Sequence, residues 1–169
     1  MVTKAFLNSL FCVNDFSKVP AIKQGQQFEH TAVNAYLKGM AEIGRPVHVQ
    51  ECGLVLHTRL SYLGASPDGM VFDSSAKPRF GLLEVKCPYQ PFVDRLTVRQ
   101  ACRLSTFCCE VDGDIIRLKR NHQYFFQVQG QMAVCKASWH DFFVWLNNST
   151  FKEWIFSMKF LCRGWLGYC

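Results

Sequence analysis

The chain has 169 residues, of which 49% are hydrophobic and 19% charged, and a formal net charge of +6. These values suit one globular domain of ordinary size and exclude a disordered chain. The charge is compatible with an anionic partner such as nucleic acid without identifying one, and no apolar run approaches the roughly 20 residues needed to span a bilayer.

The first predicted element is a helix over residues 22–40, whose apolar side chains recur at helical spacing. Gly39 and the Gly-Arg-Pro segment at 44–46 are expected to end it. Residues 47–59 alternate apolar and polar side chains around Gly53, which predicts a β-hairpin or one long strand. The apolar stripe of the helix consists of Phe28, Ala32, Ala35 and Tyr36.

The middle of the chain predicts two strands joined by a polar turn. The sequence Ser-Pro-Asp-Gly at 66–69 is a strong turn signal, and a short strand follows over 70–72. The polar stretch 73–79 reverses the chain. Residues 80–87 then predict a central strand, which Pro88 stops because proline cannot donate to a strand ladder.

The second half of the chain continues to alternate helices with strands. The predicted elements are a helix over 92–104, a short strand over 115–119, a helix over 121–136, a strand over 139–146 and a helix over 151–160. This order predicts an α/β or α+β fold in which helices flank a mixed central β-sheet. Since no repeat or linker divides the chain, all 169 residues are predicted to form a single domain.

Nine cysteines are a high count for this length. Residues 1–20 contain no clean apolar block of the kind that a secretory signal requires. We therefore expect an intracellular, reduced protein whose cysteines behave mainly as small hydrophobic residues. A zinc site is the alternative, but no CxxC occurs, and the adjacent pair Cys108–Cys109 has a spacing that structural zinc sites do not favour.

Glu84 and Lys86 are the first candidates for chemistry. Residues two apart on a strand share a face, so these two side chains would point the same way, while Leu83 and Val85 would enter the opposite packing layer. Asp68 lies at the end of the preceding strand. A hairpin return through the polar turn would bring its carboxylate beside Glu84.

Two neighbouring carboxylates suit a hard cation such as Mg²⁺ or Mn²⁺, which binds oxygen ligands. Such a cation polarises a phosphoryl oxygen and helps to generate hydroxide from water. Lys86 would lie near that water and could orient it or offset charge in the transition state. The alternative is that Glu84 and Lys86 form an exposed ion pair on an edge strand.

Four segments of the chain resemble one family. Gly64–Gly69 and Gly81–Pro88 in combination resemble the lambda exonuclease or YqaJ-like viral recombinase family, within the PD-(D/E)XK nuclease superfamily. Gln24–Glu29 resembles its first-helix motif and Tyr124–Gln129 its late helix. The resemblance spans roughly residues 22–146 and implies a core like that of restriction endonucleases.

The resemblance implies a role for each matching residue. Asp68 and Glu84 would hold the metal, with the Val85 carbonyl as a third ligand, and Lys86 would be the catalytic lysine. Glu29 would assist the metal site from the first helix, directly or through water. Its plain alternative is a solvated helix residue.

The late helix would complete the site. Tyr124 and Gln127 lie three residues apart, so one helical face presents both, and Gln131 extends that face. The plain alternatives are a core aromatic for Tyr124 and a surface amide for Gln127. Cys87 is expected to be structural despite its place in the motif.

The activity implied by the resemblance is that of a Mg²⁺-dependent deoxyribonuclease, an exonuclease on duplex DNA with a free end. Some members of the family form rings around DNA. The alternatives are an inactive nucleic-acid-binding module and a structural protein with cysteine-bound metal. Residues 1–21 lack the upstream arginine segment that members carry, which leaves polarity open. Candidate phosphate contacts are Lys23, Arg95, Arg99, Arg103, Lys119 and Arg120.

Overall fold

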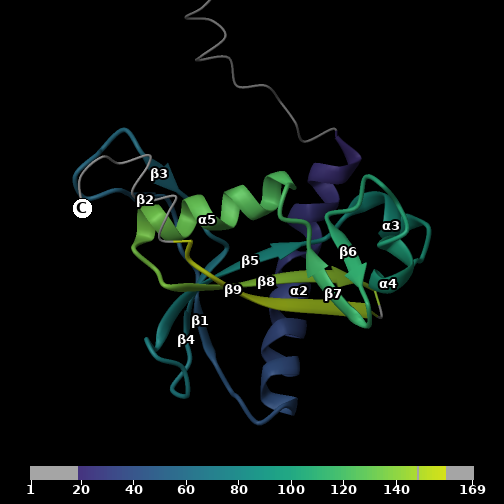
Figure 1. The fold of residues 1–169 in the computed structure, drawn as a ribbon, viewed down its shortest axis with the longest axis horizontal. Helices are drawn as coiled ribbons and strands as arrows, with labels where there is room; N and C mark the ends of the chain where they lie inside the picture. The colour runs from purple at the N-terminus through teal and green to yellow at the C-terminus, as the bar shows by residue number, and fades with distance from the viewer. Residues whose placement is uncertain (1–18, 148, 159–169) are drawn as a thin grey trace, which may run out of the picture.

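A five-stranded mixed sheet lies at the centre of the fold (Figure 1). The computed structural model describes residues 19–147 and 149–158, and every structural statement below concerns these residues. The strand order across the sheet is β1-β4-β5-β8-β9. The bounds are His48–Gln50 for β1, Gly69–Phe72 for β4, Phe80–Lys86 for β5, Trp139–Leu146 for β8 and Ser149–Phe156 for β9.

One pairing in the sheet differs in direction from the rest. Strands β1 and β4, β4 and β5, and β8 and β9 pair antiparallel, whereas β5 and β8 pair parallel. The parallel register sets Leu82 opposite His140 and Glu84 opposite Phe142. The predicted mixed sheet is confirmed.

Two long helices cover opposite faces of this sheet (Figure 1). Helix α2 (Pro20–Glu42) packs on one face and α5 (Gln123–Cys135) on the other. The face of a strand residue follows from its place in the alternation. On the α2 side the buried residues include Ala32, Tyr36, Val71, Leu83, Val85, Phe143 and Trp145, and on the α5 side Leu82, Val128, Met132, Phe142, Val144 and Leu146.

The predicted helix over 151–160 is wrong, because residues 149–156 form strand β9. Asn147 adopts a left-handed φ of 42°, and Leu146 pairs with Ser149, so the chain reverses in a tight hairpin. Trp154 and Ile155 then pack into the sheet, as aromatic and β-branched residues prefer. The last two residues of that prediction, 159 and 160, lie outside the described residues.

The remaining differences concern short elements. The predicted helix over 92–104 is divided into α3 (Tyr89–Val93) and α4 (Val98–Ala101), with Arg95 at a φ of 53° between them. Residues 47–59 form no hairpin with one another, because β1 pairs with β4 and β2 (Val55–Leu56) pairs with β3 (Gly64–Ala65). The strands without a predicted counterpart are β3 (Gly64–Ala65) and β6 (Cys109–Asp112), and β6 pairs with β7 (Ile115–Leu118).

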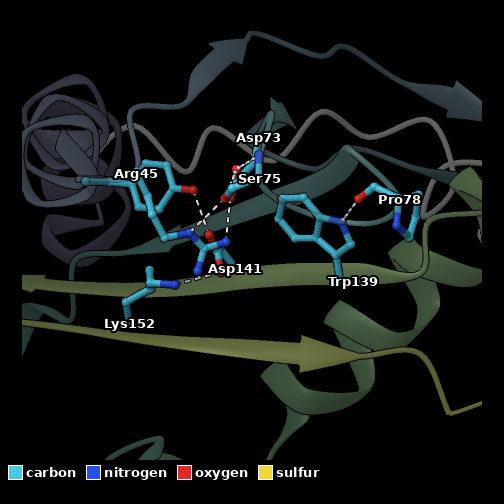
Figure 2. Close-up of polar contacts among 8 residues, drawn as sticks. Arg45, Asp73, Ser75, Pro78, Trp139, Asp141 and Lys152 are labelled. Atoms are coloured by element: carbon cyan, nitrogen blue, oxygen red, sulfur yellow. Dashed lines mark hydrogen bonds and ion pairs between the residues drawn. The ribbon is translucent and has the colours of Figure 1, made fainter. Parts of the chain in front are cut away.

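A network of charged side chains lies on the α2 side of the sheet, and we call it the back network (Figure 2). Arg45 donates to the Asp73 carboxylate at 2.6 Å. Tyr36 donates to Asp141 at 2.7 Å, and Lys152 lies 3.2 Å from the other oxygen of that carboxylate. These five residues tie the end of α2 to the turn after β4 and to strands β8 and β9.

No described helix is long and apolar enough to cross a membrane.

Candidate active site

Asp68 and Glu84 are held next to each other by the β4–β5 hairpin. The backbone N–H of Asp68 donates to the Leu83 carbonyl at 3.1 Å, and the Val85 N–H donates to the Asp68 carboxylate at 2.7 Å. The turn before β4 therefore aligns Asp68 with the end of β5, as the sequence predicts. Leu83 and Val85 face the α2 side, whereas Glu84 contacts side chains of α5.

Glu84 is almost fully buried, with only 2% of its surface exposed. Lys86 and Gln127 both donate to its Oε1, the glutamine at 2.6 Å, and Gln131 donates to Oε2 at 2.7 Å. A carboxylate offers about four acceptor positions, so three donors leave room for one further cationic partner. The structure thus brings Glu84, Lys86 and Gln127 together, and it excludes an exposed Glu84–Lys86 pair on an edge strand.

Lys86 lies between this carboxylate and an aromatic ring. Its Nζ is 4.7 Å from the ring centroid of Tyr124, within the range of a cation–π contact. Burial favours the neutral amine, but the Glu84 carboxylate outweighs it and raises the pKa of Lys86 above its usual value. The ammonium therefore stays charged. Tyr124 packs against the core on the α5 side and also lines the site.

An open pocket of about 310 Å³ lies beside these groups. Glu29 lines it from α2 with an exposed side chain, and Tyr124 lines it from α5, so the first helix borders the pocket. Burial and the nearby Glu29 and Asp68 carboxylates raise the pKa of Cys87 to about 12, so its thiol stays protonated. The other lining residues are Ala21, Ile22, Gly25, Gln26, Asp68, Val85, Lys86, Pro88 and Tyr89.

The charge balance of the site bears on metal binding. Burial and the Glu84 carboxylate raise the pKa of Asp68 to about 6. Among the described residues, no cluster of three or more His, Cys, Asp or Glu side chains could hold a metal ion. Mg²⁺ usually takes only one or two carboxylates and completes its shell with water and phosphate oxygens, so Asp68 and Glu84 fit that requirement.

The sequence did not identify one buried neighbour of the site. His140, on β8, is fully buried, and its Nε2 lies 2.8 Å from Oε1 of Gln131. A single histidine in an apolar strand gives no sequence signal, whereas Gln131 follows Gln127 at helical spacing. Three of the predicted phosphate contacts bond to other described residues. Arg99 donates to the carbonyl of 114, Lys119 donates to the carbonyls of 105 and 107, and Arg120 pairs with Glu153.

Comparisons with known proteins agree with this architecture. Two crystal structures of LHK-Exo, an alkaline exonuclease from Laribacter hongkongensis, share the fold. The one in complex with dAMP is 24% identical, with a TM-score of 0.60, over 94% of this chain and 68% of that one. The other is 23% identical, with a TM-score of 0.58, over 97% of this chain and 75% of that one. No curated protein matches the chain.

The family model named YqaJ-like viral recombinase domain matches residues 3–138. This match covers all the motifs that carry the sequence resemblance, including both carboxylates, the lysine and the late helix. The predicted absence of the family's N-terminal segment falls largely on residues 1–18, outside the described residues. On the extent of the match, the chain belongs to the YqaJ-like viral recombinase family.

Proposed function

We propose that the chain is a metal-dependent deoxyribonuclease that hydrolyses phosphodiester bonds from a free end of duplex DNA. The observation that carries the proposal is the placement of Asp68, Glu84 and Lys86. A half-buried carboxylate, Asp68, and a buried one, Glu84, lie beside one ammonium, which pairs with Glu84, next to an open pocket. Membership of the family and the fold shared with an alkaline exonuclease support the same activity.

Each residue of the site has a defined task in this proposal. A divalent cation, when bound, would supply charge stabilisation at the phosphoryl oxygen and a more acidic water. Asp68 and Glu84 would hold it, with the Val85 carbonyl as a further ligand and Glu29 acting directly or through water. Lys86 donates towards the attacking water or the phosphate.

The late helix supports the lysine and the glutamate. Gln127 donates a 2.6 Å hydrogen bond to Glu84 and so favours the observed orientation of the carboxylate. The ring of Tyr124 flanks the Lys86 ammonium and limits where it can move. Both residues therefore keep the reacting groups in place without themselves exchanging protons.

The test is cleavage of end-labelled linear DNA and closed circular DNA by the purified protein. We expect Mg²⁺ or Mn²⁺ to support loss of the linear duplex only, EDTA to abolish it, and Ca²⁺ to support binding better than turnover. Full activity in EDTA would contradict the two-carboxylate mechanism. DNA binding without cleavage in any divalent cation would instead identify an inactive binding module.

A further inference from the structure

Gln131 contacts both chain segments that carry the carboxylates of the site. Its Nε2 donates to Oε2 of Glu84 at 2.7 Å and lies 3.4 Å from the carbonyl oxygen of Ser66, two residues before Asp68. The side chain is buried, with 4% of its surface exposed. Gln131 is thus the one described side chain that hydrogen-bonds to Glu84 and also to the turn leading to Asp68.

Gln131 can make both contacts only if the NH₂ end of its side-chain amide faces Glu84 and Ser66. Glutamine presents an NH₂ group on one side and an oxygen on the other, and the two ends are nearly equal in shape. A carboxylate accepts only the NH₂ end, whereas the reversed amide would place two acceptors in contact. Because the two ends have nearly the same shape, the polar groups on either side of the amide, Glu84 and His140, determine its orientation.

His140, on strand β8, faces the oxygen end of the Gln131 amide. Its Nε2 lies 2.8 Å from Oε1 of Gln131, and its Nδ1 lies 3.1 Å from the Asp141 carbonyl oxygen. Burial lowers the pKa of His140 to about 3, so the ring is neutral and carries one proton. Both neighbours are acceptors, so the single ring proton can serve only one of them, and the contact with Gln131 is the shorter of the two.

We propose that His140 and Gln131 are positioning residues that form a relay, in which the His140 N–H fixes the Gln131 amide and the amide fixes Glu84 and the turn leading to Asp68. The proposal rests on the proposed nuclease function for its effect on rate. Supporting groups of this kind are known to change metal affinity or activity by about 10- to 100-fold when removed.

The structure offers a matched control on the same helix. Gln129 is also a buried glutamine, with 6% of its surface exposed, and it bonds two backbone groups of the last described residues. Its Nε2 donates to the Phe156 carbonyl at 3.0 Å, and its Oε1 accepts from the Met158 N–H at 2.8 Å. Neither partner belongs to the site, so Gln129→Met should disturb the fold as much as Gln131→Met and leave the site intact.

The experiment compares Gln131→Met, His140→Phe and Gln129→Met with the unchanged chain. For the first two we expect kcat to fall by about 10- to 100-fold and equilibrium Mn²⁺ binding to weaken, with DNA affinity in Ca²⁺ unchanged. His140→Gln, which keeps an N–H donor, should recover part of the loss. Equal behaviour of Gln131→Met and Gln129→Met would overturn the relay.

A spectroscopic measurement separates the relay from the activity. The ¹⁵N chemical shifts of His140, assigned by their loss in His140→Phe, report which ring nitrogen carries the proton. We expect the proton on Nε2 in the unchanged chain, and a changed ring signal in Gln131→Met. A proton on Nδ1 would overturn the relay, whereas absence of nuclease activity with the proton on Nε2 would contradict only the proposed function.

Discussion

The two faces of the sheet carry buried charge in different ways. In the back network each carboxylate has its own cation, Arg45 for Asp73 and Lys152 for Asp141. At the candidate active site Asp68 and Glu84 lie near a single ammonium, Lys86, which pairs with Glu84. Asp68 forms no ion pair with any described residue.

The pKa values follow this difference in pairing. Although burial alone would raise it, hydrogen bonds from Ser75 and Arg45 hold the pKa of Asp73 below its usual range. Burial and Glu84 raise the pKa of Asp68 to about 6. Removing one partner of a buried ion pair destabilises the folded state, whereas an excess of negative charge favours the binding of a cation from solution. We therefore expect loss of a partner in the back network to lower stability, and we expect the candidate active site, with its excess of negative charge, to attract a cation.

The largest effect that would sharpen this comparison is expected at Lys86. Lys86→Ala should lower single-turnover cleavage by about a thousandfold, because a donor to the transition state is lost, while DNA binding in Ca²⁺ stays close to normal. Lys86→Arg should fail as well, since a planar guanidinium does not replace a compact ammonium. Lys38→Ala, at an exposed pair, is the control. Cleavage by Lys86→Ala at the normal rate would refute a catalytic role.

The next largest effects on the cleavage rate are expected at the two carboxylates of the site. Asp68→Asn and Glu84→Gln should each lower the cleavage rate by about a hundredfold, because metal positioning acts mainly in the transition state. Asp68→Asn should not lower the melting temperature, because Asp68 has no ion pair among the described residues. Glu84→Gln leaves the Lys86 ammonium without its partner, so it should lower the melting temperature while the fold survives. If either variant retained its rate with the same metal dependence, that residue would not be a ligand.

For the back network we expect the opposite result, a loss of stability with little change in cleavage. Asp73→Ala removes the partner of Arg45 and two hydrogen bonds from Ser75. We expect a loss of about 2–3 kcal/mol in the free energy of unfolding, less than for a fully buried pair because Arg45 is one-third exposed. Cleavage below the unfolding transition should change less than twofold. Denaturant unfolding and cleavage, measured together, test the separation of the two roles.

The smallest expected effect is a pH dependence of the metal-free protein. The raised pKa of Asp68 means that the folded state binds this proton more tightly than the unfolded chain. The resulting stability is complete below about pH 4 and is lost as the pH rises through about 6. In EDTA the melting temperature should therefore fall by a few degrees between about pH 5 and 7.

Two controls complete the pH measurement. Asp68→Asn cannot ionise, so its melting temperature should be flatter across the same interval. The lowered pKa of Asp73 gives the opposite pH dependence. The stability that Asp73 contributes is present above its pKa in the unfolded chain and is lost as the pH falls through its pKa in the folded state. An equal fall in the Asp68→Asn variant would show that another group titrates.

The sequence predicts the strands that carry the site better than the connections around it. The alternation through β5 places Glu84 and Lys86 on one face because a strand has a period of two, and this face is confirmed. The helix predicted over 151–160 is wrong because the apolar and aromatic residues of β9 are compatible with both the helical and the strand period. The hairpin that pairs Leu146 with Ser149 selects the strand. His140 was missed since its role depends on a partner on another element.

The parallel pairing of β5 with β8 has a consequence for how the protein folds. The hairpins β4–β5 and β8–β9 join segments close in the chain, so both can form early, and the first of them already aligns Asp68 with Val85. A parallel pair instead requires a long crossover, here the entire stretch from residue 87 to 138. Closing that loop is slow, and it brings α5 onto Glu84. We therefore expect the carboxylate pair to form before the groups that orient it, and catalytic competence to appear as one of the last events of folding.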